Sequence, residues 1–388
     1  MNKKAIAILG AIFILIVGTL GFLIYSKYSG SKTATPPPIV QPPPVNTTNA
    51  TPPPQNNLAS TTPAQTNPPG AVLLTSDQVI SPALFFNGQG LSYFDHQGNL
   101  YQASLQNNNG QLSLGDKKQL VIPVKAGITK ILWPSRGNDF IARLTDVTGN
   151  TIWSYFNSSL GVYIDLPPSV ESVDWMPTGD KIVFVWVDNG KGILEVGSPD
   201  TKTWQKIGDM YQTDNTVSVS SDGTQVLFYE TANPAVNNAI NSVSIDGKVW
   251  KGLVKNGQNL GVLWSPDGQK FLFGKKDPIT QKYQLWVYNL TSGEIKGLGL
   301  YTTVSKVTWD KDSNVIYAAV PDTGVPGDNS LTVDSFYRLD TSTLDKKHYP
   351  SNPGISLDGR DLFLNATSDK LFFRNAQDGG MYYLDLTQ

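Results

Sequence analysis

The sequence predicts an all-β protein and, within that class, a seven-bladed β-propeller; six or eight blades are the alternatives. The first observation behind this prediction is a hairpin motif that recurs about every 45 residues between residues 71 and 388. The second is that further strands follow each copy, and four antiparallel strands are typical of one propeller blade. Glycine, asparagine, serine, threonine and aromatic residues are plentiful, which favours strands and turns over helices.

The clearest copy of the motif runs from Val262 to Gly274 and reads VLWSPDGQKFLFG. Its central Pro-Asp-Gly favours a tight turn, because proline presets φ, aspartate bonds its own backbone and glycine accepts a positive φ. Apolar residues on both sides favour strands, so the segment predicts a β-hairpin. Weaker copies place one of the following residues where this copy has Trp264: Leu84, Trp133, Trp175, Val219, Trp309 and Leu364.

The tryptophans of the motif are predicted to be structural. Aliphatic residues replace tryptophan at the same place in other copies, which indicates packing between blades rather than stacking on a ligand. The aspartates of the turns, Asp222 and Asp267, are interpreted in the same way, as turn residues rather than catalytic groups.

A third strand is predicted after each hairpin, and the fourth strand follows a turn, as in Val249–Val254 and Glu294–Leu300. The last repeat stops after its third strand, whereas Ala71–Ser76 is a spare strand ahead of the first repeat. We therefore expect Ala71–Ser76 to supply the missing outer strand and to close the ring, which also covers an exposed edge. The predicted third strands are Asn99–Ser104, Thr151–Phe156, Gly192–Gly197, Asn241–Ile245, Tyr283–Asn289, Asp334–Leu339 and Met381–Leu386.

An uncharged stretch near the N-terminus predicts a membrane anchor. Ala5–Tyr25 has 21 residues, enough to span a bilayer core as a helix and longer than the apolar region of a cleaved signal peptide. Lys3 and Lys4 precede it, and the bias of positive charge favours a cytoplasmic N-terminus. We expect a single-pass protein of the cell membrane whose remaining chain lies outside the cytoplasm, with residues 1–29 forming the cytoplasmic tip and the transmembrane helix.

Residues 30–70 predict a disordered stalk. Nearly half of the 26 prolines of the chain fall in this segment, several of them in triplets, and Lys32 is its only charged residue. Such a composition cannot bury enough apolar surface to fold, and runs of proline favour extended polyproline II. The predicted organisation is therefore an anchor, a stalk and a propeller at residues 71–388.

The composition argues against several kinds of chemistry. The net charge of −2 gives no basic field for nucleic acid, and the absence of cysteine removes disulfides, thiol catalysis and zinc-thiolate sites. The only histidines, His96 and His348, fall in different repeats, which argues against a histidine metal site. We therefore expect no catalytic, cofactor-binding or metal-binding residues and no cofactor, although carboxylates from different blades can converge on a central channel.

Partner binding is expected at loops that join second and third strands, because they share one face of a propeller with the connections between blades. Two of these loops are long, Thr231–Ile240 and Pro321–Val333, and a third, Lys275–Lys282, is basic. Long loops on a rigid scaffold are common places for binding. The candidate residues are Asn233, Asn237, Asn238, Asp322, Asp328, Asn329, Lys275 and Lys276.

The motif from Trp264 to Gly268, followed by two residues and an apolar run, resembles the repeat of TolB-type propellers, a group of the WD-repeat-like propeller superfamily. The resemblance covers residues 71–388 and implies a protein-binding or scaffolding propeller outside the cytoplasm. We expect a membrane-anchored, non-enzymatic module that binds an envelope protein or polymer. The alternatives are a structural subunit of an envelope or secretion assembly, and a carboxylate-dependent hydrolase with its site in the channel.

Overall fold

Antiparallel strands joined by turns dominate the computed structural model, which describes residues 70–85, 88–200, 203–230, 238–277, 282–325, 330–350 and 354–387. Its described residues form 27 strands, so the all-β prediction is confirmed. The chain divides into two units, Met1–Ala64 and Gln65–Gln388, and every described residue belongs to the second. No helix among the described residues is long and apolar enough to cross a membrane, and the predicted anchor and stalk up to residue 69 lie outside them.

Strands that follow one another in sequence are neighbours in the sheets, so each sheet is an antiparallel meander. The first three sheets each contain four strands. They are β2 (Ile80–Phe85), β3 (Gly90–Phe94), β4 (Leu100–Asn108) and β5 (Gln111–Leu120); β6 (Ile128–Leu132), β7 (Phe140–Thr145), β8 (Thr151–Asn157) and β9 (Val162–Asp165); and β10 (Val170–Trp175), β11 (Ile182–Asp188), β12 (Lys191–Gly197) and β13 (Trp204–Met210).

The middle of the chain forms one sheet of seven strands, in which β17 takes part twice. The first part of β17 pairs with β16 and its second part pairs with β18, and Asn256, next to the change of partner, has a φ of 57°. Where separate strands were predicted, the structure thus has one continuous strand. The strands are β14 (Asn215–Val219), β15 (Gln225–Glu230), β16 (Asn238–Ser244), β17 (Trp250–Trp264), β18 (Lys270–Lys276), β19 (Tyr283–Asn289) and β20 (Ile295–Gly297).

Two more four-stranded sheets complete the described fold, and the last contains the two ends of the described chain. Within it β1 pairs with β27, with Ala71 opposite Leu384, so the first described strand lies at the edge of a sheet made by the last repeat. The strands are β21 (Val307–Trp309), β22 (Val315–Thr323), β23 (Val333–Asp340) and β24 (Lys346–Tyr349), preceded by the short 3-10 helix η2 (Val304–Lys306); and β25 (Gly359–Leu364), β26 (Lys370–Asn375), β27 (Met381–Asp385) and β1 (Ala71–Thr75).

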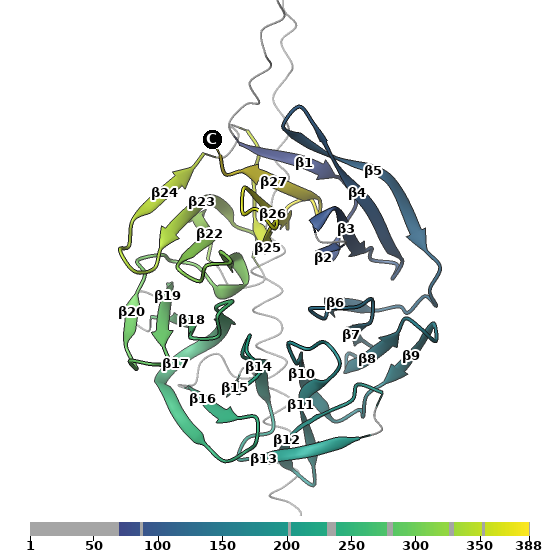
Figure 1. The fold of residues 1–388 in the computed structure, drawn as a ribbon, viewed down its shortest axis with the longest axis vertical. Coiled ribbons are helices and arrows are strands. Elements are labelled where there is room, and N and C mark those ends of the chain that lie inside the picture. Colours follow the sequence, from purple (N-terminus) through teal and green to yellow (C-terminus); the bar gives the residue numbers. More distant parts are fainter. Residues whose placement is uncertain are drawn as a thin grey trace, which may run out of the picture. The chain divides into compact units, whose positions relative to one another are not determined.

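Hydrophobic clusters join the face of each group of strands to the next. Phe94 and Phe140, for example, belong to one cluster between the first two sheets, with ring centroids 5.2 Å apart. Another cluster contains Tyr93 of the first sheet and Phe372 of the last. Figure 1 shows the sheets following one another around a common centre, with β2, β6, β10, β14 and β25 on the inner side. Apolar burial between successive sheets, rather than one central core, therefore stabilises the fold.

The tryptophans of the motif lie between inner strands, as predicted. Trp175 Nε1 donates a hydrogen bond to Leu132 O of the preceding sheet at 2.9 Å, and Trp309 Nε1 donates to Leu263 O at 3.3 Å. Trp264 makes the equivalent bond to Ser218 O at 3.2 Å. Since a buried indole N–H needs an acceptor, these bonds fix each inner strand against its predecessor.

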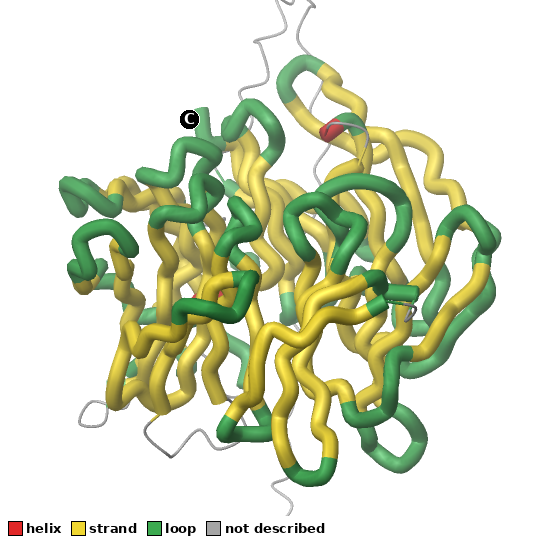
Figure 2. The backbone as a smooth tube through the Cα atoms, turned by 60° about the horizontal axis from the view of Figure 1, so that its bottom comes forward, coloured by secondary structure: helices red, strands yellow, loops and turns green. Residues whose placement is uncertain are grey.

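The strand directions give the ring of sheets two different ends, which Figure 2 shows as loops and turns at the two ends of the strands. One end carries the loops between second and third strands and the connections from one sheet to the next; we call it the connection face. The other end carries the turns that join first to second and third to fourth strands; we call it the hairpin face.

In the turns of the hairpin face, side chains of the turn itself accept the hydrogen bonds of its backbone N–H and hydroxyl groups. Asp267 Oδ1 accepts hydrogen bonds from Ser265 Oγ at 2.5 Å and from Gln269 N at 3.0 Å, and Gly268 has a φ of 68°. Partial burial works to raise the pKa of Asp267, but the hydrogen bonds outweigh it and hold that pKa below the usual value. The turn aspartates thus act as the structural residues that the sequence predicts.

Candidate functional site

A polar cleft of about 480 Å³ lies where the inner strands of several sheets meet. Its lining includes Lys130 from β6, Glu171 from β10 and Val262 from β17, together with Asp214 from the connection before β14. Glu171 is the second residue of β10 and Asp214 directly precedes β14, so the cleft is near the connection face. We call it the channel cleft.

One wall of the channel cleft is basic and aromatic. The Arg143 guanidinium lies 6.0 Å from the centre of the Trp153 ring, and Arg143 Nη2 donates a hydrogen bond to Thr151 Oγ1 at 3.4 Å. Trp153 Nε1 in turn donates to Glu171 O of the next sheet at 3.3 Å. Cation and ring are therefore held together at a wall that is open to a ligand.

Carboxylates lie in and beside the cleft: Asp214 lines it, and Glu230 neighbours Asp214. Burial raises the pKa of Glu230, and the neighbouring Asp214 raises it further through repulsion and a hydrogen bond. Gln212 Nε2 donates to Glu230 Oε2 at 2.6 Å. Together with Glu171, these groups bring carboxylates of two sheets towards the mouth of the cleft, a convergence that the sequence allowed but did not assign to residues.

Asp174, deeper in the cleft, connects two sheets. Its Oδ1 accepts a hydrogen bond from Trp175 N at 2.9 Å, and its Oδ2 accepts one from Val219 N of β14 at 2.8 Å. Burial raises the pKa of Asp174 to about 6 against the effect of these bonds. Because both oxygens are engaged by backbone N–H groups, Asp174 is a linking residue.

The predicted partner-binding residues divide into two groups. Asn233, Asn237, Asp328 and Asn329 lie outside the described residues. The other four lie near the connection-face ends of strands and none lines the channel cleft.

Each of the four described candidates has a contact of its own. Asn238, at the start of β16, is 7% exposed, and its Nδ2 donates to Glu230 O at 3.3 Å. Asp322 accepts a hydrogen bond from Ser335 Oγ at 2.6 Å. The Lys275 and Lys276 ammonium groups lie over the rings of Trp286 and Tyr283, at 4.7 and 5.8 Å from the ring centres.

A buried ionic network under the connection face was missed at the sequence level. Lys306 is 2% exposed, and its Nζ lies 2.5 Å from both Asp334 Oδ2 and Asp358 Oδ1. Lys306 also donates to Thr332 Oγ1 at 2.8 Å, and Arg360 Nη2 lies 3.0 Å from Asp358 Oδ2. The network joins η2 to the loop before β23 and to the connection before β25, so it fixes the base of the connection face.

The two aspartates of this network respond differently to burial. Burial raises the pKa of Asp334. At Asp358, burial acts in the same direction, but hydrogen bonds from Arg360 and Lys306 lower the pKa to about 2. No local sequence pattern predicts this network, because its members come from three separate segments.

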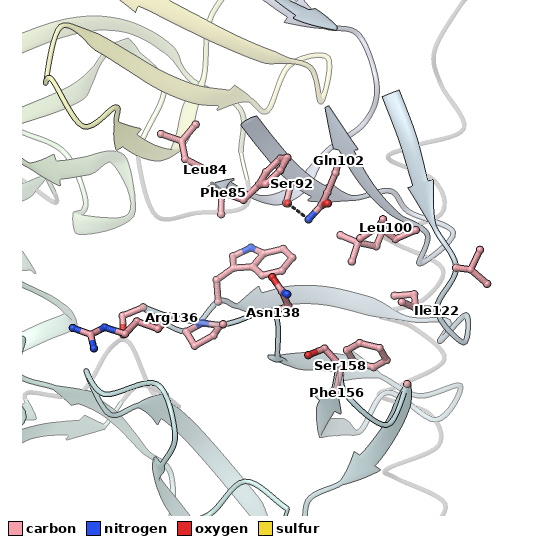
Figure 3. A pocket seen from close by; sticks show the side chains of 18 of the residues that line it. Leu84, Phe85, Ser92, Leu100, Gln102, Ile122, Arg136, Asn138, Phe156 and Ser158 are labelled. Carbon is pink, nitrogen blue, oxygen red and sulfur yellow. Dashed lines mark hydrogen bonds between the residues drawn. The ribbon is translucent and has the colours of Figure 1, made fainter. Parts of the chain in front are cut away.

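A further cavity, of about 860 Å³, lies between the first two sheets. Figure 3 shows Phe85, Ser92 and Gln102 on one side of it and Asn138 and Phe156 on the other, with the bond from Gln102 Nε2 to Ser92 Oγ dashed. That bond is 3.1 Å long. The cavity offers aromatic and amide groups, but Arg136 is its only charged lining residue.

Metal ligands do not gather in the described part of the chain. No group of three or more histidine, aspartate or glutamate side chains there is placed to hold a metal ion, and the chain has no cysteine. The chemistry that the described residues offer is therefore binding through charge, hydrogen bonds and aromatic faces, with the carboxylates of the channel cleft as the groups suited to proton transfer.

No family model matches this sequence, and no curated protein sequence matches it. Among solved structures, an oligogalacturonate lyase from Vibrio parahaemolyticus is similar, with 12% identity, a TM-score of 0.57, and coverage of 81% of this chain and 93% of the lyase. Hydrazine synthase from Kuenenia stuttgartiensis is 11% identical, with a TM-score of 0.54 over 81% of this chain and 96% of that one.

TolB from Acinetobacter baumannii aligns less closely, with 14% identity, a TM-score of 0.45, and coverage of 76% of this chain and 78% of TolB. At these identities the likenesses show the fold alone, and membership of the TolB-type group stays a prediction. The likeness to the lyase, taken with the antiparallel four-stranded sheets around a common centre, shows that this chain has a β-propeller fold.

Proposed function

We propose that this chain is a membrane-anchored, extracytoplasmic propeller of seven blades that binds an envelope protein or polymer on its connection face and catalyses no reaction. The anchor and the location rest on the sequence, namely the uncharged stretch Ala5–Tyr25 and the proline-rich segment after it. The binding role rests on the described residues of the connection face.

The proposal of seven blades is supported by the strand pairing. Division of β17 between its two partners turns the seven-stranded sheet into two groups of four strands, beside five other four-stranded sheets of the described chain. Each hydrophobic cluster lies between two successive groups, and one lies between the first and the last. Pairing of β1 with β27 would close such a ring, because the first described strand completes the sheet of the last repeat and covers the edge of β27.

The observation that carries the binding proposal is the exposure of apolar side chains on the connection face. Val121, Val147 and Tyr211 have relative exposures of 103%, 105% and 108%, so they project fully into solvent. All three lie in loops of this face, and Val124, Tyr301, Val325, Leu331 and Ile355 are further exposed apolar residues there. Projecting apolar side chains around a charged cleft are typical of a protein-binding surface.

The hydrolase alternative is favoured by one observation, the carboxylates of the channel cleft. Asp214 and Glu230 interact closely enough to raise the pKa of Glu230, as acid and base pairs do in enzymes. Glu171→Gln and Asp214→Asn variants test it. A hydrolase would lose activity on an envelope glycan in both variants, whereas the binding proposal predicts no such activity in the parent protein.

Two matched triple variants test the binding proposal in cells. The connection-face variant carries Val121→Ser, Val147→Ser and Tyr301→Ser, and the hairpin-face control carries Leu160→Ser, Ile295→Ser and Leu344→Ser. All six residues are exposed, so both variants should fold.

Chemical cross-linking in intact cells, followed by extraction of the membrane and separation of complexes by size, gives the readout. We expect the connection-face variant to lose the cross-linked complex about tenfold or more, because interface energy concentrates in a few side chains. The control should keep the complex. Equal retention or equal loss in both variants would contradict the proposal.

A further inference from the structure

A second cavity of about 500 Å³ lies at the outer edge of the ring, between β13 and the sheet that begins with β14. Its volume falls in the range of about 300–1,000 Å³ that small-molecule sites occupy. We call it the outer groove. Its lining includes Tyr211, Asn215, Phe228, Asn241 and Trp250.

The outer groove exists because, along one row of cross-strand neighbours, the residue nearest the outer edge of the sheet has no side chain. Val217 pairs with Phe228, Phe228 with Asn241, and Asn241 with Gly252, so these four residues lie on the same face. Val217 packs with Met210 and Ile207 of the preceding sheet in a buried cluster. Towards the outer strand an amide and a glycine take the place of apolar side chains, and the space between the sheets stays open.

Aromatic rings frame the two ends of the groove. Trp250 is 41% exposed, its ring centre lies 5.5 Å from that of Phe228, and its Nε1 donates to Gly247 O at 2.9 Å. A Cβ at Gly208 would lie only 2.4 Å from Trp250 Cζ2, so glycine there lets the indole lie across the neighbouring sheet. At the other end Tyr211 projects fully into solvent. Trp250, which its contacts hold in place, and the projecting Tyr211 both offer flat apolar faces to a ligand.

A buried acceptor without a partner lies at the inner end of the groove, on Asn215, which lines both this groove and the channel cleft. Asn215 is 3% exposed, and its Nδ2 donates to Gln212 O at 2.8 Å. Within the described part of the chain, Asn215 Oδ1 has no hydrogen-bond partner. Side chains of a strand alternate between faces, so Asn215 shares the face of Val217, which packs on the preceding sheet as the groove does. An unpaired buried acceptor lowers the stability of the fold, so a ligand that donates a hydrogen bond here would be favoured.

The groove has little unpaired charge to attract an ion. Asp209 forms an ion pair with Lys206 at 2.6 Å. Lys251 lies between Trp250 and Gly252 on β17, and the alternation of side chains turns it to the opposite face of the strand. Although Lys251 lines the groove, its side chain starts from the opposite face of the strand, so an anionic ligand would find little cationic charge there. An acyl chain would leave Asn215 Oδ1 unpaired.

We propose that the outer groove binds a neutral saccharide. A sugar ring presents C–H faces that pack on Tyr211 and Trp250, and hydroxyl groups that donate to Asn215 Oδ1. The Asn241 amide, which Gly252 leaves uncovered, supplies a donor and an acceptor beside them: a Cβ at Gly252 would lie 3.5 Å from Asn241 Oδ1. This site shares Tyr211 with the protein-binding surface proposed above, but Asn215, Asn241 and Trp250 are not part of that surface, and the saccharide proposal does not depend on it.

Titration calorimetry tests the proposal on the full-length chain in a detergent without a sugar headgroup. The probes are cellotetraose, maltotetraose and chitotetraose, with a tyrosine- and proline-rich peptide as the competing ligand class. We expect at least one oligosaccharide to bind with a dissociation constant below about 10 mM. Tyr211→Ala should weaken that binding about three- to tenfold through loss of ring contact, and Asn241→Ala should weaken it similarly.

Two variants outside the groove serve as controls. Tyr301→Ala removes an exposed tyrosine from another connection, and Glu171→Gln changes the channel cleft; both should leave saccharide binding unchanged. Asn215→Leu should abolish binding while the variant stays folded, as circular dichroism would verify. The proposal is overturned if no oligosaccharide binds at about 10 mM, if Tyr211→Ala and Asn241→Ala bind as the parent does, or if only the peptide binds.

Discussion

The two faces of this propeller are built from the same strands but differ in what repeats. On the hairpin face the same turn recurs: Asp222 Oδ1 accepts from Ser220 Oγ at 2.6 Å, and Asp267 Oδ1 accepts from Ser265 Oγ at 2.5 Å. On the connection face, exposed valines and tyrosines, a channel cleft and a buried ionic network each occur in particular segments. Features that repeat around a ring maintain the fold, so the features that do not repeat are the place to look for function.

The ring itself is common to both faces, and its closure gives the largest expected effect. Replacing Ala71–Thr75 by glycine and serine of equal length removes the strand that pairs with β27 and the buried Ala71 side chain. We expect the melting temperature of the propeller to fall by about 10 °C or more. The same replacement at residues 65–69 is the control. A parental melting temperature in the β1 variant would show that β1 does not close the ring.

The next prediction contrasts lysines of the two faces. Lys306→Met leaves Asp334 and Asp358 buried without their cation, and should lower the free energy of unfolding by about 3–5 kcal/mol. On the hairpin face, Lys296 is half-buried and donates to Ser342 O at 2.5 Å, so Lys296→Met should cost about 1 kcal/mol. Chemical denaturation measures both. Equal losses of unfolding free energy in the two variants would mean that the buried ionic network does not stabilise the connection face.

A smaller effect depends on pH. The pKa of Asp174 is raised from 3.8 to about 6, so the folded state binds this proton more tightly than the unfolded state. Its contribution to stability is present below about pH 4 and is lost as the pH rises through 6. Compared with an Asp174→Asn variant, the parent should lose about 2–3 kcal/mol of unfolding free energy over this window. A difference between the two proteins that stays constant with pH would contradict this.

The hairpin face should show the opposite sign. Hydrogen bonds from Ser244 and Lys248 lower the pKa of Asp246 from 3.8 to about 2. The contribution of Asp246 is therefore present above pH 4 and lost as the pH falls towards 2. An Asp246→Asn variant should match the pH dependence of the parent above pH 4 and diverge from it only in acid.

The hairpin face could be predicted from sequence because its signals are local. Turn residues and alternating apolar residues lie within a few positions of one another, and the third strand predicted at Tyr283–Asn289 is β19 with the same bounds. The merger of two predicted strands into β17 was missed, because Asn256-Gly257 is a typical turn signal, yet the strand continues through it with Asn256 at a φ of 57°.

The side-chain contacts of the connection face could not be predicted from the sequence. Lys306 of η2, Asp334 of β23 and Asp358 before β25 come together only in the folded chain. The Asn215 Oδ1 atom is unpaired because no described neighbour supplies a donor to it. Strand count predicted which face carries the long loops, much of which lies outside the described residues, whereas the exposed Val121 and Val147 lie in connections that the prediction did not include.

The most direct test of function on the connection face is site-specific photo-cross-linking in living cells. A photoreactive residue is placed at Val147 or Tyr301 on the connection face, and at Leu160 or Leu344 on the hairpin face, in otherwise parental protein. We expect a discrete partner to be cross-linked through Val147 and Tyr301, and no partner through Leu160 and Leu344. Cross-links of equal yield from both faces, or from the hairpin face alone, would contradict it.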